Sequence, residues 1–308
     1  GAITRGLLTK PPRILLYATD GIGKSTFGSR APDPIFLCAE DGTAGLDVAR
    51  FPEPRTWLEV LAAVDELTNS DHEYRTLVLD TLDWIEPLIH AHVCQQNGWK
   101  DIEAPGYGKG YVAALDQWRI LLARLDALRA RRGMIIVLLA HSTLRNFKNP
   151  DGADFDRYEL KLNAKASAVV REWADAVLFA NYETLTAKSD GRVRGLSTGA
   201  RFIYSAWRAA WDAKNRYDLP EQLPLSWSEL HAAIAGGSTE NLQPLRAEAT
   251  GLMAQVDPAT REKAQAYLDS HPDDPRALAQ LVDRLRAKVA LTTKPKPSAD
   301  GADQEISQ

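Results

Sequence analysis

The chain has 308 residues, of which 44% are hydrophobic and 25% are charged, and its formal net charge is −4. This balance is typical of a globular protein and excludes a disordered or fibrous chain. The net charge argues against a protein coated with basic groups, while a local basic groove for nucleic acid stays compatible with it.

The chain also lacks the sequence features of a membrane or secreted protein. No run approaches the roughly twenty apolar residues of a membrane span, and the N-terminus lacks the charged-then-apolar layout of a secretion signal. We therefore expect a cytoplasmic protein without membrane contact. Cys38 and Cys94 fall in a predicted strand and a predicted helix, which favours packed thiols over a disulfide or a metal site.

Short apolar runs alternate with helical patterns along most of the chain. Strands are predicted over 13–17, 35–39, 76–80, 134–140 and 176–179. Helices are predicted over 56–67 and 112–131, where apolar residues recur at the spacing of one helix face. This alternation predicts an α/β fold with a mostly parallel sheet covered by helices on both faces.

A glycine-bearing loop directly follows the first predicted strand. Residues 18–26 read Ala-Thr-Asp-Gly-Ile-Gly-Lys-Ser-Thr. In such a phosphate-binding P-loop, backbone NH groups surround a polyphosphate, Lys24 reaches the β and γ phosphates, and the Ser25 hydroxyl binds Mg²⁺. Ala18 replaces the first glycine of the usual pattern, so the loop must begin with ordinary backbone. The predicted ligand is ATP or GTP, bound by Thr19, Asp20, Gly21, Ile22, Gly23, Lys24, Ser25 and Thr26.

Acidic residues end the next two central strands. Asp80, at the position called Walker B, is predicted to hold Mg²⁺ beside Ser25, and the alternative is that it caps the following helix. Its neighbour is Thr81 rather than a second carboxylate, so the catalytic base must come from elsewhere. Glu40 is predicted to orient or deprotonate the attacking water, with Asp41 as the fallback, unless one of the two only begins a turn.

Further polar residues follow later strands. His141 comes directly after the predicted strand 134–140 and is expected to sense the γ phosphate, unless it is a structural histidine. Lys214 and Arg216 stand two residues apart on a predicted strand, so their side chains share one face. We expect this pair to neutralise transition-state charge, within the chain or across a subunit interface, and the alternative is a solvated basic edge.

The chain changes character after residues 236–238, which read Gly-Gly-Ser. Beyond them the pattern is helical only, and Asp257-Pro258 and Asp274-Pro275 each place a capping residue before a proline at the first helical position. We expect an ATPase core over 1–237, a helical domain over 238–291 and a disordered tail over 292–308.

These features together resemble the RecA-like ATPases, most closely the phage-encoded relatives of RecA and RadA that act as recombinases or single-strand annealing proteins. The resemblance spans residues 10–234 and rests on the P-loop, Ala-Glu40, Leu-Val-Leu-Asp80-Thr and Lys214-x-Arg216. It implies a Mg²⁺-dependent ATPase that forms a filament or ring, with ATP between subunits and Lys214 and Arg216 acting on the neighbour's nucleotide. RecA itself has an amide at the position of His141.

In this family, DNA contacts come from loops that follow the central strands. The segments 96–111 and 142–158 mix aromatic with basic residues, as stacking on unpaired bases and phosphate neutralisation require. The resemblance implies binding of single-stranded DNA, annealing or strand exchange, and a single-strand binding protein as a further partner. The predicted phosphate contacts are Lys109, Arg145 and Lys148, and the predicted stacking residues are Tyr107 and Phe147. The alternative is that these segments are ordinary active-site loops.

Two other functions fit the same residues. A ring-forming motor or helicase loader would share the ATPase site, and a KaiC-like regulatory ATPase would use it without binding DNA. A GTPase is disfavoured because the chain has no Asn-Lys-x-Asp guanine motif, and a small-molecule kinase because no lid for an acceptor is recognisable.

Overall fold

The computed structural model describes residues 10–40, 43–150, 152–189, 192–236 and 243–270, and positions 278, 281, 282, 284–286, 288 and 289. The chain divides into two compact units, Gly1–His231 and Ala232–Gln308. The division lies shortly before the predicted boundary at residue 237. The predicted tail over 292–308 lies outside the described residues, as does Asp41.

The first unit is built on one β-sheet. Its strands are β1 (Arg13–Ala18), β2 (Pro34–Cys38), β3 (Ala49–Arg50), β4 (Thr76–Asp80), β5 (Ile135–Phe147), β6 (Phe155–Leu160), β7 (Ala176–Ser189), β8 (Arg192–Tyr204), β9 (Lys214–Asn215) and β10 (Gln222–Pro224). The order is β10-β8-β7-β1-β5-β4-β2-β3, with β6 paired to β5 and β9 paired to β7. The neighbours from β7 through β1, β5, β4 and β2 to β3 pair in parallel. The remaining pairs are antiparallel, so the predicted mostly parallel sheet is confirmed.

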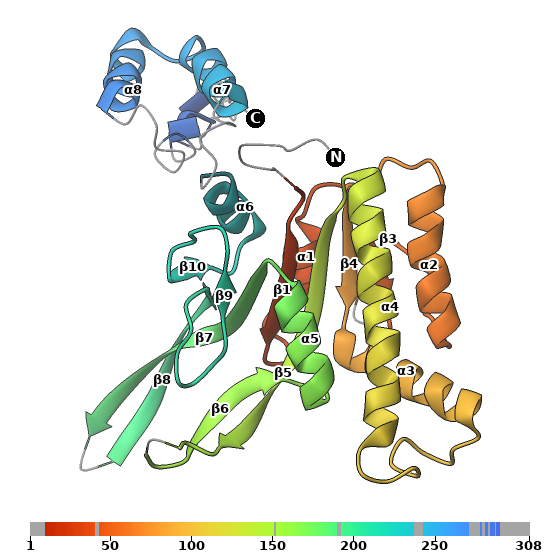
Figure 1. Cartoon of the computed structure of the whole chain (residues 1–308). Helices are drawn as coiled ribbons and strands as arrows, with labels where there is room; N and C mark the ends of the chain where they lie inside the picture. The colour runs from red at the N-terminus through yellow and green to blue at the C-terminus, as the bar shows by residue number, and fades with distance from the viewer. Residues whose placement is uncertain are drawn as a thin grey trace, which may run out of the picture. The chain divides into compact units, whose positions relative to one another are not determined.

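Helices lie on both faces of this sheet. They are α1 (Lys24–Ser29), α2 (Trp57–Asn69), α3 (Leu82–Asn97), α4 (Lys109–Arg132) and α5 (Ala164–Trp173), while α6 (Trp227–Gly236) crosses the division between the two units. In Figure 1, α4 and α5 lie in front of the sheet and α1 lies behind it. The predicted helices 56–67 and 112–131 correspond to α2 and α4. Helix α2 starts with a capping box, in which Thr56 and Glu59 each bond the other's backbone NH.

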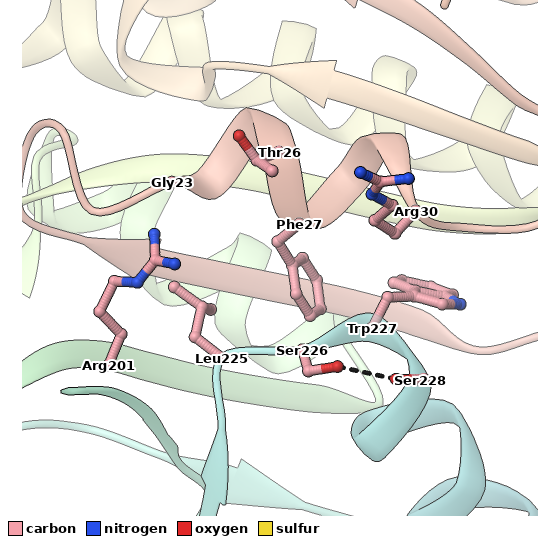
Figure 2. Close-up of a pocket in the computed structure, with 9 residues that line it drawn as sticks. All are labelled: Gly23, Thr26, Phe27, Arg30, Arg201, Leu225, Ser226, Trp227 and Ser228. Atoms are coloured by element: carbon pink, nitrogen blue, oxygen red, sulfur yellow. Dashed lines mark hydrogen bonds between the residues drawn. The ribbon is translucent and has the colours of Figure 1, made fainter. Parts of the chain in front are cut away.

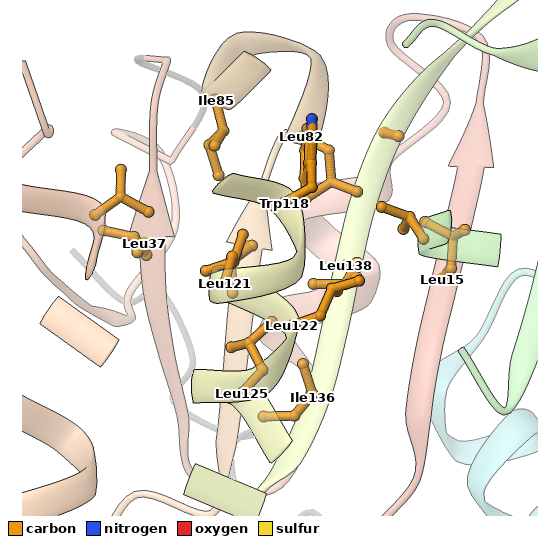
Figure 3. Packing of buried hydrophobic residues seen from close by; sticks show 14 of the residues in the cluster. Leu15, Leu37, Leu82, Ile85, Trp118, Leu121, Leu122, Leu125, Ile136 and Leu138 are labelled. Atoms are coloured by element: carbon orange, nitrogen blue, oxygen red, sulfur yellow. The ribbon is translucent and has the colours of Figure 1, made fainter. Parts of the chain in front are cut away.

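The main core lies between the sheet and the α2–α5 layer (Figure 3). Strand residues of one parity, such as Leu15 and Leu138, face this layer because successive side chains point to opposite faces. Helix α4 contributes Trp118, Leu122 and Leu125 at the spacing of one helix face, all almost completely buried. Burying each such side chain stabilises the fold by about 2 kcal/mol, so this layer fixes the strands that carry the P-loop.

Helix α1 packs closely against the opposite face of the sheet, and Gly28 is the point of contact. A Cβ atom added to Gly28 would lie 3.0 Å from Val78 Cγ1 and 3.3 Å from Phe36 Cζ. A larger residue at position 28 would therefore push α1 away from β2 and β4. This contact positions the helix that follows the P-loop.

Strand β1 lies between β5 and β7, so the strand order reverses beside it. In open α/β sheets, ligands bind at the carboxyl ends of the strands where the order reverses. The P-loop follows the carboxyl end of β1. The topology therefore places this loop where such folds bind their ligands.

Strand β5 continues past its predicted end at residue 140 and forms a hairpin with β6. The register pairs Ser142 with Leu160 and Phe147 with Phe155, and the two phenylalanine rings lie 5.1 Å apart. The prediction of a loop over 142–158 is therefore wrong for most of that segment. The cause is tertiary, because β6 supplies the backbone partners that a polar sequence does not announce.

The second unit contains α7 (Gln243–Met253) and α8 (Pro258–Ser270) among its described residues. The Asp257 carboxylate accepts hydrogen bonds from the backbone NH of Thr260 at 3.0 Å and from its hydroxyl at 2.7 Å. Asp257 thus caps α8 as its sequence predicts, whereas Asp274-Pro275 lies outside the described residues. No helix in the described part of the chain is long and apolar enough to cross a bilayer.

Candidate functional site: a P-loop between two cavities

The P-loop turns sharply from β1 into α1. Ala18 is the last residue of β1 and pairs with His141 on one side and Ala180 on the other, so it has ordinary strand backbone as predicted. Gly21 has φ of 71° and Gly23 has φ of 105°, both in the region that favours glycine. The two glycines of the motif are therefore required by the backbone path.

The Lys24 side chain is buried within this turn. Its ammonium donates a hydrogen bond to the carbonyl oxygen of Thr19 at 3.2 Å. Burial lowers the pKa of Lys24, and the nearby Asp80 and Asp20 carboxylates oppose that effect. A buried ammonium held beside glycine NH groups is suited to bind a polyphosphate.

Ser25 and Asp80 meet beneath the P-loop. The Ser25 hydroxyl donates to Asp80 Oδ2 at 2.5 Å, and Asp80 Oδ1 is buried without a partner among the described residues. Burial raises the pKa of Asp80. The residue at the N-cap of α3 is Thr81, so Asp80 is not the capping residue. An orphaned carboxylate oxygen beside a hydroxyl fits a hard cation such as Mg²⁺, and Ser25 and Asp80 would hold it.

A cavity of about 690 Å³ opens over these residues. Glu40 and His141 line it together with Lys24, Ser25 and Asp80. The Thr81 hydroxyl donates to Glu40 Oε1 at 3.5 Å. Burial raises the pKa of Glu40. The structure thus brings together the residues predicted for phosphate binding, metal binding and water activation.

His141 is oriented by a carboxylate that sequence reasoning missed. Asp83 accepts from the His141 backbone NH at 2.9 Å and from Nδ1 at 2.8 Å, while Nε2 lies 3.3 Å from Asp20 Oδ1. Burial alone would raise the pKa of Asp83, but the hydrogen bonds from His141 outweigh it and lower the pKa. This pairing holds the proton on Nδ1 and turns Nε2 toward the P-loop. The only sequence signal was the position of Asp83 one turn after Asp80.

A second cavity, of about 460 Å³, lies on the other side of the P-loop (Figure 2). Phe27 and Trp227 form its aromatic wall, with ring centroids 5.3 Å apart, and Arg30 and Arg201 stand on either side of it. Gly23 and Thr26 line both cavities. The two cavities therefore meet at the P-loop.

A family model described as an AAA domain, AAA_24, matches residues 10–217. The chain belongs to the AAA_24 family. With its mostly parallel α/β sheet and its P-loop, the matched segment has the fold of a P-loop ATPase domain of the AAA type, and this family implies nucleotide binding.

Other comparisons add little to this assignment. Among solved structures, the AAA_24 chain is similar to the flagellar accessory protein FlaH from Methanocaldococcus jannaschii, with 9% identity and a TM-score of 0.31. The similarity covers 63% of this chain and 78% of FlaH. A comparison with curated proteins finds no match.

Lys214 and Arg216 lie at the opposite edge of the AAA_24 sheet. Lys214 pairs with Val177 near the start of β7, and its ammonium donates to the carbonyl oxygens of Glu172 at 2.6 Å and Ala174 at 2.7 Å. Arg216 forms an ion pair with Asp175 at 3.2 Å. The P-loop lies at the carboxyl end of β1, so the structure does not bring this pair to the nucleotide site of the same chain.

The residues predicted to bind DNA occupy two separate segments. Tyr107 lies in the connection before α4 and Lys109 begins that helix, whereas the other three lie on or beside the β5–β6 hairpin. Arg145 lies 3.8 Å from the Glu159 carboxylate, and Lys148 lies 2.5 Å from that of Asp154. Phe147 packs against Phe155.

Two cross-strand neighbours hold the P-loop from the β7–β8 ribbon, and sequence reasoning missed both. Tyr182 and Arg201 are paired in register. The Tyr182 hydroxyl donates to the Gly21 carbonyl at 3.4 Å, and Arg201 Nη1 donates to the Ile22 carbonyl at 2.8 Å. No local motif marks them, because each contact joins residues far apart in the chain.

Proposed function

We propose that this AAA_24 protein is an oligomeric, Mg²⁺-dependent ATPase that binds single-stranded DNA and promotes annealing or strand exchange. The observation that carries the ATPase part is the hydrogen bond between half-buried Ser25 and buried Asp80 beneath the P-loop, in a cavity shared with Glu40 and His141. This arrangement combines a phosphate cradle, a cation site and a carboxylate that can act on water.

The chain's own residues divide the hydrolytic step between them. Lys24 holds the β and γ phosphates, and Ser25 and Asp80 would hold Mg²⁺, which would supply charge neutralisation at the phosphate oxygens. Glu40 accepts the proton of the attacking water. The burial that raises the pKa of Glu40 makes it a better base for this task. His141, held by Asp83, directs Nε2 toward the γ phosphate.

Binding of single-stranded DNA is supported by the solvent exposure of Tyr107. Its side chain is completely exposed, with a relative accessibility of 101%. Gly106, Tyr107 and Gly108 have φ values of 70°, 49° and 68°, so three successive residues adopt left-handed backbone. A non-glycine residue rarely adopts this conformation, and strained positions of this kind concentrate at binding sites. An exposed ring in such a turn is suited to stack on an unpaired base.

An oligomer is supported by the position of Lys214 and Arg216. If this pair acts on a nucleotide, that nucleotide must belong to a neighbouring subunit, because the pair lies at the sheet edge opposite to the P-loop. A head-to-tail arrangement, in a filament or a ring, meets this condition.

A second function, that of a regulatory ATPase without DNA, is favoured by one observation. Arg145 and Lys148, which were predicted to contact phosphates, are each within reach of a carboxylate of their own hairpin. Cations paired in this way contribute less to DNA binding.

The anisotropy of a fluorescent single-stranded oligonucleotide distinguishes the two functions. We expect binding to the single strand that is stronger with ATP and Mg²⁺ than without nucleotide, weaker to duplex, and independent of ATP in Lys24→Ala. Equal and weak binding to both DNA forms, unaffected by ATP, would instead favour the regulatory ATPase.

A further inference from the structure

The P-loop contains peptide planes that its glycines leave free to turn. Gly21 and Gly23, with φ of 71° and 105°, stand on either side of Ile22. The Ile22 side chain is completely buried, so it fixes where the loop lies but not how the adjoining peptide planes are turned. Planes that can turn must be ordered when a ligand binds, and the entropy lost in this ordering weakens binding.

The orientation of these planes decides where the NH groups of the loop point. In a trans peptide, the C=O of one residue and the N–H of the next lie in one plane and point in opposite directions. A donor that holds the Ile22 carbonyl therefore turns the Gly23 NH to the other side of the loop, toward the cavity that Lys24 and Ser25 line. A donor on the Gly21 carbonyl orients the Ile22 NH in the same way.

The β7–β8 ribbon is placed to supply such donors. Strand β1 ends at Ala18, which pairs with Ala180, whereas β7 continues to Ser189 and so passes beside the P-loop. Tyr182 comes two residues after Ala180 and pairs in register with Arg201 of β8. Side chains of directly opposed residues lie on the same face of a sheet. Both side chains can therefore reach the loop together.

Arg201 makes the closer of the two contacts with the loop. Its Nη1 donates to the Ile22 carbonyl at 2.8 Å, whereas the Tyr182 hydroxyl lies 3.4 Å from the Gly21 carbonyl. The guanidinium also lies against Gly23, where a Cβ atom would be 2.8 Å from Nη1 (Figure 2). A charged donor bonds more strongly than a neutral one and polarises the peptide unit that it holds. Arg201 should therefore have the larger effect on the loop.

The backbone of Arg201 is itself fixed within the sheet. Its carbonyl accepts a hydrogen bond from the Leu225 NH at 2.9 Å. The next residue of β8, Phe202, pairs with Pro224 of β10. The guanidinium thus projects from a paired strand onto a glycine loop, which is the arrangement that holds a mobile backbone in one orientation.

We propose that Arg201 is a positioning residue of the nucleotide site, with Tyr182 as a weaker second. By holding the Ile22 carbonyl, Arg201 turns the Gly23 NH toward the polyphosphate before the ligand binds. It acts through the P-loop backbone rather than on the reacting atoms. The proposal rests on the proposed ATPase function and assigns to the β7–β8 ribbon a part in phosphate affinity.

The test compares two replacements of Arg201 in the full chain. Arg201→Met has a long side chain without an N–H donor, and Arg201→Lys keeps a charged donor. With Mg²⁺ present, we expect Arg201→Met to weaken binding of ATP and of inorganic tripolyphosphate by about tenfold each, because the loop NH groups serve the phosphates that both probes share. The kcat should change by less than about threefold, since an orientation needed equally by bound substrate and transition state affects binding alone. Arg201→Lys should bind both probes within about threefold of the wild type.

A second readout needs no ligand. Amide hydrogen exchange over residues 18–26 of the nucleotide-free protein should be faster in Arg201→Met than in the wild type or Arg201→Lys. Tyr182→Phe removes a single oxygen atom and should weaken tripolyphosphate binding by about threefold. Arg208→Gln replaces an exposed arginine beyond the end of β8 that pairs with Glu221. This variant is the matched control and should leave binding, kcat and exchange unaltered.

Three results would overturn the positioning role. The first is a fall in kcat of about a thousandfold in Arg201→Met with unchanged ATP binding, because Arg201 would then act on the transition state. The second is unchanged tripolyphosphate binding in a folded Arg201→Met protein, and the third is an equal loss in the Met and Lys variants. Lys24→Ala identifies a failure of the ATPase site itself. If that variant binds both probes as the wild type does, the P-loop site fails, whereas loss in Lys24→Ala with normal binding in Arg201→Met overturns only the role of Arg201.

Discussion

Asp80 and Asp83 flank the start of α3, yet their surroundings shift their pKa values in opposite directions. Burial raises the pKa of Asp80, whereas the hydrogen bonds from His141 overcome burial and lower the pKa of Asp83. Carboxylates separated in this way often have different tasks. Here one is suited to hold a cation and the other to orient an imidazole.

Replacing Asp80 should increase stability and lower activity. Because the folded pKa of Asp80 is raised, the native state binds more protons than the unfolded state above the usual aspartate range, and stability falls as pH rises through that window. Asp80→Asn should therefore increase the free energy of unfolding in metal-free buffer at neutral pH, by on the order of 1 kcal/mol. It should lower hydrolysis by about a hundredfold or more through loss of the cation. Urea unfolding and phosphate release measure the two effects, and a less stable apo variant would contradict the burial argument.

Replacing the second carboxylate should have the opposite effect on stability. The folded pKa of Asp83 is depressed below 3.8, so its contribution is present at neutral pH and is lost as pH falls through that lowered value. Asp83→Asn should lower the free energy of unfolding at pH 7 by about 2 kcal/mol and reduce kcat more than it changes KM, because His141 loses its orientation. The difference between variant and wild type should shrink below pH 4. An unchanged kcat in a folded Asp83→Asn protein would remove His141 from the reaction.

Much of the site was predictable residue by residue. The P-loop and Asp80 were found because their chemistry depends on local spacing after apolar strands. Asp83 and Arg201 were missed because they act through partners that only the fold brings near. The Arg201 guanidinium reaches a carbonyl 179 positions away in the chain. No periodicity carries that information.

At the scale of elements, three segments converge on Asp175. Arg13 of β1 donates to it at 2.7 Å, Arg129 of α4 at 3.2 Å and Arg216 after β9 at 3.2 Å. Burial would raise the pKa of Asp175, but these arginines, Arg13 above all, lower it. This cluster joins the start of β7 to the helix layer at the edge opposite to the P-loop.

Asp175→Asn is expected to destabilise the fold by about 3 kcal/mol at neutral pH, because it leaves the arginines without their shared anion. Since the folded pKa is depressed, the effect is full above the usual aspartate range and disappears as pH falls through the lowered value. Denaturant midpoints at pH 7 and pH 3 measure it. An equal loss of stability at both pH values would point to packing rather than charge.

The left-handed turn before α4 gives a prediction for DNA binding. Tyr107→Ala should weaken binding of a single-stranded oligonucleotide by about tenfold, the cost of one stacked base. Tyr107→Phe keeps the ring and should bind like the wild type. ATP hydrolysis without DNA should be unchanged in both. If Tyr107→Ala binds DNA normally, the exposed ring has another purpose.

The elements themselves were largely predictable, with one instructive exception. The strands predicted over 13–17, 35–39 and 76–80 and the helices α2 and α4 follow from the pattern of apolar residues. The β5–β6 hairpin does not, because Ser142, Thr143, Arg145 and Asn146 carry no strand pattern and depend on pairing with β6.

At the scale of the whole molecule, the separation of Arg216 from the P-loop makes assembly testable. Arg216→Ala should retain ATP binding and lose turnover, and Lys24→Ala should lose nucleotide binding. If Arg216 acts on a neighbour, mixing the two variants restores activity at interfaces that combine an intact P-loop with an intact arginine, about one quarter of them for random head-to-tail mixing. Diluting Arg216→Ala with buffer is the control. Absence of any recovery on mixing would exclude action across the interface.

The rate of ATP hydrolysis at fixed salt, measured without DNA, with single-stranded DNA and with duplex DNA, tests the account most directly. We predict Mg²⁺-dependent hydrolysis that single strands stimulate, that duplex does not, and that Lys24→Ala abolishes. Hydrolysis that persists in Lys24→Ala would contradict the P-loop site, and Lys24-dependent hydrolysis that is indifferent to both DNA forms would contradict the role on single-stranded DNA.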